Sequence, residues 1–439
     1  MVKLARTFGR LNPAKVMVIG DLLLDSYTIG KARRISPEAP VAVVHVDKEE
    51  HRPGGAGNVV LNLVSLGTEV VTIGRVGKDW AGDTLCEAFN KEGIHTKAIF
   101  VQDHYRTPVK NRIIADNQQI VRVDHEQIVV LSESLEQQII DSLPQLIEDV
   151  KIIAISDYGK GFLTTTLLNA IIGLAKERGI PVITDPKGHD FSKYEGSTFI
   201  KPNLKEAYAA ANLPINAPLE TVAKRILQIC NAEILMVTRS EAGISLFNAN
   251  GERLDFPVRA RQVMDVTGAG DTVLATLTCA LANELSYAEA AQLCNVTAGI
   301  AIERMGCARV TLSDLAQRLL EEDVSNKVFD EEHLFALQEV LKTKPFTLLT
   351  LSNIKEISSA LYKAIRNLSE KRPTLLLYIE DSNPDESYID MLASFKDVSF
   401  ILLHSQSLKL LCEKVIPEES YIFDGFKLEK VTKRVSIIK

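Results

Sequence analysis

The sequence predicts an α/β fold in which a parallel sheet carries helices on both faces, followed by a second, smaller α/β unit. Three observations predict it. Short runs of β-branched residues alternate with segments of helical period from about residue 15 to residue 240. Two β-rich stretches interrupt this alternation, and a shorter series of strand-like runs begins near residue 345. Such alternation is typical of parallel strands joined by crossover helices.

The composition is that of an ordinary globular protein. A chain of 439 residues, 46% hydrophobic and 24% charged, can form two or three domains with a large core. The net charge of −7 argues against a general nucleic-acid binder. No apolar run reaches the ~20 residues that cross a bilayer, and the N-terminus lacks the apolar stretch of a signal peptide. We therefore expect a cytoplasmic protein with no nucleic-acid or membrane partner. The six scattered cysteines form no CxxC pair, which argues against disulfides or a zinc site.

The expected strands of the main sheet end in polar residues. Helical segments at 56–67, 167–179 and 219–231 separate strands at 15–21, 69–77, 151–157, 180–186, 197–203 and 234–240. Ligands of parallel sheets bind beyond the carboxyl ends of the strands. Asp21, Asp157, Asp185 and Asn203 close four of these strands and are placed to meet a ligand.

Two extended ribbons, 40–55 and 106–127, do not fit the alternation. Their β-branched residues and intervening turn residues predict a small β-sheet outside the main domain. Such a sheet could cover a site as a lid or serve as a dimer surface. An edge hairpin of the main sheet is the alternative.

The chain changes character beyond about residue 325. A charged, helical stretch at 326–344 is expected to link residues 1–325 to a smaller domain over 345–439. Strand-like runs at 346–351, 374–380 and 398–404 predict that this smaller domain is also α/β.

The stretch DVTGAGDT, residues 265–272, is the first candidate for chemistry. A Gly-Ala-Gly turn leading into an apolar helix presents unpaired backbone N–H groups, and these donors with the helix dipole favour an anion. Asp271 beside them could accept a proton from a substrate hydroxyl while a phosphoryl group is transferred. A capped core helix with a flexible entry is the alternative for this motif taken alone.

Three further motifs add to it. Residues 53–67 form a second Gly-rich entry to a helix, in which Asn58 can make paired hydrogen bonds. The stretch GDLLLD places Asp21 and Asp25 where carboxylates could bind sugar hydroxyls. In KPNLKEA, Glu206 could help to hold hydrated magnesium near phosphates. Asn203 and Glu206 could equally form only a capping box at the start of a helix.

Together these motifs resemble the signature regions of the ribokinase-like (PfkB) carbohydrate kinases. Residues 54–83 and 265–272 resemble the two signatures, and NLKE resembles the NxxE motif of the family. Further segments are similar to the kinase half of the bifunctional heptose 7-phosphate kinase/heptose 1-phosphate adenylyltransferases of lipopolysaccharide biosynthesis: 34–41, 117–126, 156–163, 185–188 and 237–247. This resemblance covers about residues 10–320 and implies a ribokinase-like sheet with a small β lid.

The resemblance implies ATP-dependent phosphorylation of D-glycero-D-manno-heptose 7-phosphate at C1, with Mg²⁺. Asp271 matches the catalytic base, and the backbone of Gly268, Ala269 and Gly270 matches the anion hole. Four residues match sugar-binding positions: Asp21, Gly54, Gly55 and Asn58. The nucleotide positions are Asn203, Leu204, Lys205, Glu206, Thr238, Ala298 and Gly306, with Glu206 also the candidate metal residue. The family also implies a homodimer built through the lid strands.

A phosphorylated sugar needs a cationic partner at the far end of its pocket. The candidates are Lys110, Arg112, Arg122, Lys160 and Lys187. The sequence does not choose among them, and a solvated surface charge is the alternative for each.

Two segments depart from the family pattern. In 298–310, the residues Glu303, Arg304 and Cys307 replace small, basic and hydroxyl residues, which puts nucleotide affinity in question. Residues 346–368 keep a strand-then-helix pattern but contain neither the histidines nor the glycines of a nucleotidyltransferase. We expect a degenerate nucleotidyltransferase-like domain without adenylyltransferase activity, in which His404 is a surface or capping residue.

Two other functions stay open from the sequence. The chain could be a PfkB kinase for another sugar or a nucleoside, or a non-catalytic scaffold that binds a sugar phosphate. The intact Asp271 with its glycine turn disfavours the scaffold, and the segments 34–41 and 117–126 favour the heptose substrate.

Overall fold

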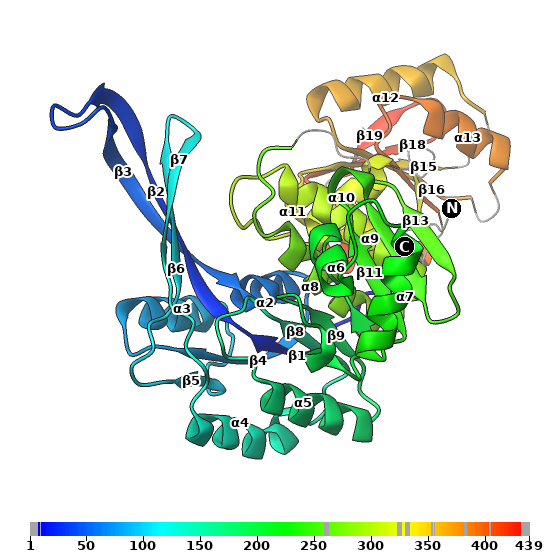
Figure 1. Cartoon of the computed structure of the whole chain (residues 1–439). Coiled ribbons are helices and arrows are strands. Elements are labelled where there is room, and N and C mark those ends of the chain that lie inside the picture. Colours follow the sequence, from blue (N-terminus) through cyan, green and yellow to red (C-terminus); the bar gives the residue numbers. More distant parts are fainter. Residues whose placement is uncertain are drawn as a thin grey trace. The chain divides into compact units, whose positions relative to one another are not determined.

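The computed structural model describes residues 8, 10–258, 263–322, 327–329, 334–352, 354, 356–381, 384–403 and 405–431. The chain divides into two compact units, coloured along the sequence in Figure 1. The larger unit is Asn12–Thr311, and the smaller unit combines Leu312–Lys439 with Met1–Leu11. This division falls earlier than the boundary expected at residue 325. The described part of the expected linker, 326–344, contains a strand and a helix of the smaller unit.

A nine-stranded sheet forms the centre of the larger unit, in the order β13-β12-β11-β10-β9-β8-β1-β4-β5. The strands from β11 to β5 are parallel, and β12 and β13 are antiparallel at one edge. The predicted parallel sheet is therefore confirmed. The strands are β1 (Lys15–Gly20), β4 (Glu69–Val76), β5 (Ile99–Val101), β8 (Ile153–Ser156), β9 (Val182–Asp185), β10 (Phe199–Ile200), β11 (Ile234–Thr238), β12 (Ile244–Asn248) and β13 (Arg253–Phe256).

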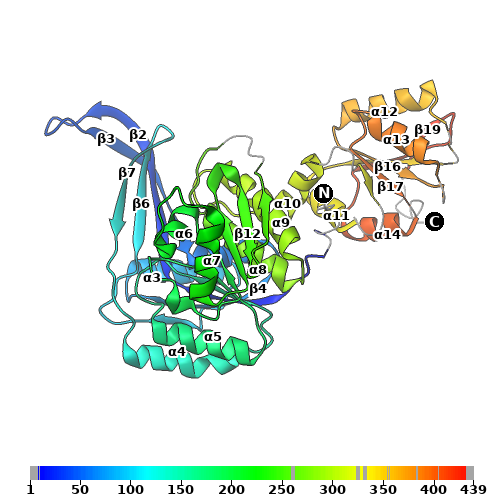
Figure 2. The same ribbon diagram turned by 45° about the vertical axis from the view of Figure 1, so that its right-hand side comes forward.

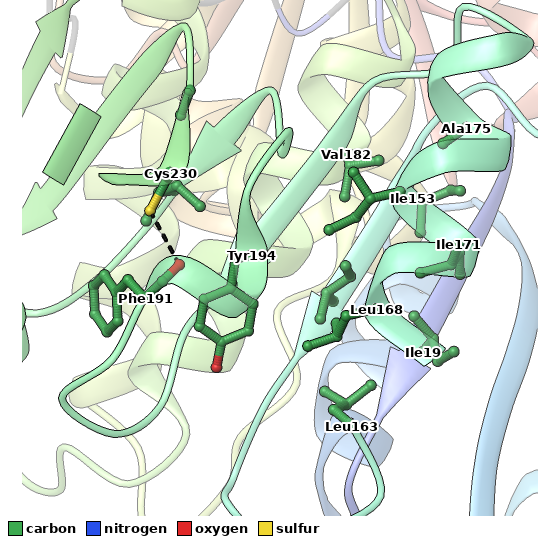
Figure 3. Packing of buried hydrophobic residues seen from close by; sticks show 14 of the residues in the cluster. Ile19, Ile153, Leu163, Leu168, Ile171, Ala175, Val182, Phe191, Tyr194 and Cys230 are labelled. Carbon is green, nitrogen blue, oxygen red and sulfur yellow. Dashed lines mark hydrogen bonds between the residues drawn. The ribbon is translucent and has the colours of Figure 1, made fainter. Parts of the chain in front are cut away.

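Helices cover both faces of this sheet because its central strands are apolar on both sides. On one face, a continuous cluster of buried side chains joins the sheet to α4, α5, α6 and α7. Figure 3 shows part of this cluster, with Leu168, Ile171 and Ala175 of α5 beside Ile153 of β8. On the other face, α8 contacts α2 and α9 and the strands β1, β8 and β9. The helices of this unit are α2 (Ala56–Ser65), α3 (Trp80–Lys91), α4 (Glu133–Leu146), α5 (Thr165–Glu177), α6 (Leu204–Ala211), α7 (Leu219–Cys230), α8 (Ala269–Ala282) and α9 (Tyr287–Ile302), with 3-10 turns η1 (Ser192–Tyr194) and η2 (Ser240–Ala242).

The strand order reverses at β1. The chain runs outward from β1 to β4 and β5, and then returns to place β8 on the other side of β1. Crevices at such reversal points are where ligands bind in open parallel sheets. Asp21 follows β1 and Tyr158 follows β8, so both lie at this point.

The two interrupting ribbons form a separate sheet that projects from the larger unit (Figures 1 and 2). Its order is β3-β2-β6-β7, with β2 and β6 parallel and the outer pairs antiparallel. The prediction of a sheet outside the main one is confirmed, and it also recruits residues after Asp21, which continue as a strand. The strands are β2 (Leu22–Ile35), β3 (Ala42–Gly55), β6 (Val109–Ala115) and β7 (Gln118–His125).

The smaller unit has a six-stranded sheet in the order β14-β17-β16-β15-β18-β19, parallel except for β19. Two apolar clusters cover its faces. Phe8 belongs to this unit: its side chain is fully buried and stacks on Phe335 at 5.5 Å between ring centroids. The elements are α10 (Leu312–Glu322), β14 (Val328–Phe329), α11 (Leu334–Thr343), β15 (Thr347–Leu351), α12 (Ser359–Lys371), β16 (Leu375–Ile379), α13 (Glu386–Ser394), β17 (Phe400–Leu403), α14 (Ser405–Lys414), β18 (Glu419–Phe423) and β19 (Leu428–Lys430).

Among the described residues, no helix combines the length and the apolar composition that would let it span a membrane. The six cysteines are free thiols, and those at 230, 279, 294 and 307 are buried.

Candidate active site

Asp271 lies in the first turn of α8, and only 3% of its surface is exposed. Both carboxylate oxygens are hydrogen-bonded. The Tyr158 hydroxyl donates to Oδ1 at 2.6 Å, and the Asn58 amide donates to Oδ2 at 2.9 Å. Burial raises the pKa of Asp271 to about 7, although these two hydrogen bonds act to lower it. A carboxylate with such a pKa is suited to take up a proton near neutral pH.

The turn before α8 has the backbone conformation that its glycine permits. Gly268 precedes the helix with φ of +76°, in the left-handed region. A Cβ there would lie 2.7 Å from the Asn58 amide nitrogen, whereas a Cβ at Gly270 would meet only open space. The Ala269 N–H donates to the Val266 carbonyl at 3.3 Å. Among the described residues, the space beside Gly270 at the first turn of α8 is therefore free of other atoms within 4 Å.

Asn58, which is expected among the sugar-binding residues, donates a hydrogen bond to Asp271. It lies buried in α2, and its side-chain oxygen accepts a hydrogen bond from Asn62 at 3.1 Å. That bond leaves the Asn58 amide group facing Asp271. The glycine-rich helix start and the GAGD turn therefore meet at the candidate base.

Tyr158 was not expected from the sequence. It lies in the loop after β8, and its backbone N–H donates to Asp21 Oδ2 at 2.9 Å. The signal available in the sequence was its position, since it follows Asp157 directly at the carboxyl end of an expected strand.

Asp21 combines complete burial with an unpaired oxygen. Its Oδ2 accepts from the N–H groups of Tyr158 and Lys160, at 2.9 and 3.1 Å. Within the described part of the chain, its Oδ1 is buried and has no hydrogen-bond partner. Burial, together with the charge of Asp157, raises the pKa of Asp21 to about 6. An acceptor of this kind can bind a ligand hydroxyl.

Gly54 leaves room for the carboxylate of Asp25, and Gly55 leaves room for the backbone of Asp21. A Cβ at Gly54 would lie 2.1 Å from Asp25 Oδ2, and one at Gly55 would lie 2.8 Å from the Asp21 carbonyl. Asp25 forms a buried ion pair with Arg112 and accepts from the Cys307 thiol at 3.2 Å. The positive charge of Arg112 is thus balanced by the carboxylate of Asp25.

The other predicted cations have different partners. Lys110 lies over the Tyr158 ring, 5.4 Å from its centroid, and burial and nearby Lys160 lower the pKa of Lys110. Lys160 is buried and pairs with Glu126 at 2.8 Å. Arg122 is exposed on β7 and pairs with Asp124. The Lys187 side chain passes Gly159 and pairs with Glu206 at 2.7 Å.

The NLKE segment forms a full capping box. The Asn203 side chain accepts from the Glu206 N–H, and the Glu206 side chain accepts from the Asn203 N–H. Leu204 and Lys205 are the first two residues of α6, and a bridge pairs Asn203 with Thr238 at the end of β11. Five predicted nucleotide positions therefore lie around one helix start and the neighbouring strand end.

The departing segment 298–310 contacts Asp265 and the strand β2. Ala298 lies half-buried on α9. The Gly306 N–H donates to Asp265 Oδ2 at 2.9 Å, and the Cys307 N–H donates to the Tyr27 hydroxyl at 3.1 Å. Gly306 is thus bound to Asp265 in the DVTGAGDT stretch, and the altered Cys307 is bound to β2.

Over the part of the chain that the structure describes, no group of three or more His, Cys, Asp or Glu side chains could hold a metal ion. Glu206 is a single carboxylate. A single carboxylate fits a hydrated Mg²⁺, which is commonly held by one or two carboxylates and by the phosphates of its substrate.

Comparison with known proteins identifies the family. Residues 13–314 match the pfkB family of carbohydrate kinases. The chain belongs to this family. The pfkB match covers the whole of the larger unit except its first residue, and so includes every site residue described above.

Curated relatives extend further along the chain. The bifunctional protein HldE of Trichlorobacter lovleyi is 44% identical over 366 residues, which cover 80% of this chain and 74% of that protein. HldE of Geobacter metallireducens is 46% identical over 310 residues, covering 70% and 63%. This chain is thus similar to bifunctional HldE proteins.

Solved structures agree on the fold. Phosphofructokinase-2 from Escherichia coli, in complex with potassium, superimposes with a TM-score of 0.59 at 20% identity, over 70% of this chain and 99% of that one. Ribokinase from Arabidopsis thaliana, complexed with ribose and ATP, gives 0.55 at 18% identity over the same shares. The ribokinase-like fold of the larger unit and its assignment as a carbohydrate kinase, a phosphotransferase, are confirmed.

Proposed function

We propose that the larger unit transfers the γ-phosphoryl group of ATP to C1 of D-glycero-D-manno-heptose 7-phosphate. The observation that carries the chemistry is the pair of hydrogen bonds that hold buried Asp271 at the open start of α8. The similarity to HldE proteins over 80% of the chain supports the heptose substrate.

In this proposal Asp271 is the base. It accepts the proton of the C1 hydroxyl as that oxygen attacks the phosphorus atom of the γ-phosphoryl group. The bond from this phosphorus to the bridging oxygen breaks, and ADP leaves. The first turn of α8, with Gly268, Ala269 and Gly270, stabilises the negative charge on the transferring group.

Asp21 is proposed to bind the sugar. Its unpaired, buried Oδ1 needs a donor, and a sugar hydroxyl supplies one. Gly54 and Gly55 keep side chains away from Asp25 and Asp21, so their part in sugar binding is to leave space.

For the 7-phosphate, the contacts favour Lys110 and Lys160 over the other cations. The two ammonium groups are close enough to influence each other, and Lys110 lies over Tyr158, whose hydroxyl reaches Asp271. Arg112 is matched by Asp25, and Arg122 is matched by Asp124 at the surface. Lys187, beside Glu206, belongs to the nucleotide side.

ATP is proposed to lie along Asn203, Leu204, Lys205, Thr238, Ala298 and Gly306, with Glu206 near hydrated Mg²⁺, which would neutralise phosphate charge. Glu206→Gln keeps the capping box, because glutamine can also cap, but removes the carboxylate charge. We expect this variant to need more Mg²⁺ for half-maximal turnover. An unchanged Mg²⁺ requirement would leave Glu206 with a capping role only.

The first experiment compares ADP release from ATP and Mg²⁺ with heptose 7-phosphate, fructose, ribose or no sugar. Heptose 7-phosphate alone should stimulate release strongly, and Asp271→Asn should lower turnover by about 10²–10⁴-fold without unfolding the protein. Stimulation by another sugar would overturn the substrate. Failure of every sugar would favour a sugar-phosphate-binding scaffold.

We further propose that the smaller unit, a degenerate nucleotidyltransferase-like domain, has lost adenylyl transfer. Its strand order reverses between β15 and β18, where a ligand would bind, and acidic Glu380 and Asp424 follow strands at that edge. Like charges there disfavour a triphosphate. His333 and His404 lie outside the described residues. Formation of ADP-heptose from ATP and heptose 1-phosphate by the purified protein would refute the proposal.

A homodimer through the projecting sheet is also proposed. Its exposed apolar side chains support an interface. They are Ile35, Val41, Val46, Ile120, Val121 and Val123. Light scattering should give twice the mass of the 48.5 kDa chain, and a monomer at working concentration would count against the interface.

A further inference from the structure

Tyr158 makes a contact that the proposed reaction does not use. Its hydroxyl donates to Asp271 Oδ1 at 2.6 Å, a short bond to a buried carboxyl group. Tyr158 comes from a loop 113 residues away from Asp271 in the sequence. The bond therefore exists only in the folded site.

The loop of Tyr158 is fixed from several sides. Asp21 Oδ2 accepts from the N–H groups of Tyr158 and Lys160, and Asp157 Oδ1 accepts from the Gly159 N–H at 2.7 Å. The guanidinium of Arg75 donates to the Lys160 carbonyl at 2.7 Å. Arg75 is itself 1% exposed. A loop held in this way can place the hydroxyl of its tyrosine reproducibly.

Tyr158 stays a donor over the working pH range. Burial and the charge of Asp271 raise the pKa of its hydroxyl well above the usual range. It therefore donates a hydrogen bond to Asp271 whether that group is ionised or protonated, and the bond is stronger to the ionised form.

We propose that Tyr158 is a positioning residue that holds Asp271 in the orientation of a base and favours its ionised form. This inference rests on the proposed role of Asp271. Through its backbone, the same residue also contacts Asp21, so one loop ties the proposed sugar site to the proposed base.

The other groups around Asp271 do not replace Tyr158. Asn58 of α2 is the second donor, to Oδ2. Asp25 of β2 and Asp185 at the end of β9 are acidic and act to raise the pKa of Asp271, and the thiol of Cys307 after α9 also faces it. Removing the Tyr158 hydroxyl leaves Asn58 as the one side-chain donor that the structure shows on this carboxylate.

The kinetic test is the pH profile of kcat/KM for Tyr158→Phe, which keeps the ring. We expect the acidic limb to move upward by about one pH unit, because the variant loses a donor that favours the ionised base. Turnover should be lowest below pH 7 and recover toward the wild-type rate above pH 8.5. Tyr208→Phe is the matched control: its buried hydroxyl donates to the Ala217 carbonyl at 2.7 Å and touches neither carboxylate.

An unshifted limb would overturn the proposal. So would an equal loss of rate at every pH, because that result indicates a contact with the substrate. Faster ATP hydrolysis without sugar in Tyr158→Phe would also overturn it. In that case the Tyr158 hydroxyl would occupy the position of the sugar hydroxyl and so block ATP hydrolysis in the absence of sugar.

A second measurement does not need turnover. Melting temperatures of the wild type, Tyr158→Phe, Asp271→Asn and the double variant are compared at pH 5.5 and pH 8.5. Tyr158→Phe should destabilise by about 2–4 °C more at pH 8.5, where Asp271 is ionised, and this difference should disappear when Asp271→Asn is also present. Its persistence in the double variant, or its absence when Asp271 is intact, would disprove the link. A wild type that shows this coupling but turns over no sugar would overturn the proposed function and leave the link standing.

Discussion

Asp271 shows at the scale of one residue how a function can lower stability. Its carboxyl group has a pKa near 7 in the folded protein against an ordinary value of 3.8. Between these values the folded state binds a proton that the unfolded state has released. Stability is therefore greatest at low pH within this window and is lost as the pH rises through 7. The same ionisation creates the base that the proposed reaction needs.

This linkage predicts that Asp271→Asn, in which turnover should be low, is more stable relative to the wild type at alkaline pH. The free-energy advantage of the variant over the wild type should grow by on the order of 1 kcal/mol for each pH unit between pH 5 and 7, because the amide never ionises. Urea unfolding at pH 5, 6, 7 and 8 measures it. An advantage that is constant with pH would contradict the raised pKa.

The start of α8 is the element on which the site depends, and its two glycines differ. Gly268→Ala places a Cβ against Asn58 in a left-handed conformation, which costs roughly 1–2 kcal/mol for a residue other than glycine. We expect this variant to lose both stability and turnover. Gly270→Ala meets open space, and it should keep its stability within about 1 kcal/mol.

The activity of Gly270→Ala then reports on the open side of α8. If the transferring phosphoryl group lies there, the added methyl group should lower kcat at least about tenfold while the melting temperature is unchanged. Full activity would show that the phosphoryl group lies elsewhere. Circular dichroism measures the melting temperatures of the two glycine variants, and ADP release measures their turnover. Together they test whether the phosphoryl group lies beside Gly270.

Local patterns predicted the elements better than the contacts between them. The alternation of strands and helices gave the parallel sheet, and the glycine turn gave the start of α8, because both depend on neighbouring residues. The spacing of NLKE predicted the capping box as one alternative, and both of its hydrogen bonds are present. By contrast, Tyr158–Asp271 and Arg112–Asp25 join residues more than eighty positions apart, and no local pattern indicates such pairs.

Local sequence patterns also did not indicate the unit in which the N-terminal segment packs. The expected kinase domain, residues 1–325, includes Phe8, and the structure buries Phe8 in the smaller unit. A single aromatic residue carries no periodicity that could indicate its partner.

At the scale of the whole molecule, Phe8→Ala should destabilise the smaller unit and spare the kinase unit. Truncation of a fully buried phenylalanine costs about 3–5 kcal/mol. In calorimetry, one transition should move to lower temperature, while sugar-stimulated ADP release should retain its thermal midpoint. Phe426→Ala is the matched control, since Phe426 is 94% exposed. Movement of both transitions together would show that the two units unfold as one.

The burial of Phe8 also has a consequence for proteolysis. The chain passes between the two units twice, near residue 11 and near residue 311, so the kinase unit is in effect an insertion within the smaller one. A protease that cuts once near residue 311 produces two fragments, and the longer one still carries Phe8 in its place in the smaller unit. The nicked protein should give two bands on a denaturing gel and one peak in gel filtration. Only a second cut near residue 11 would release the smaller unit.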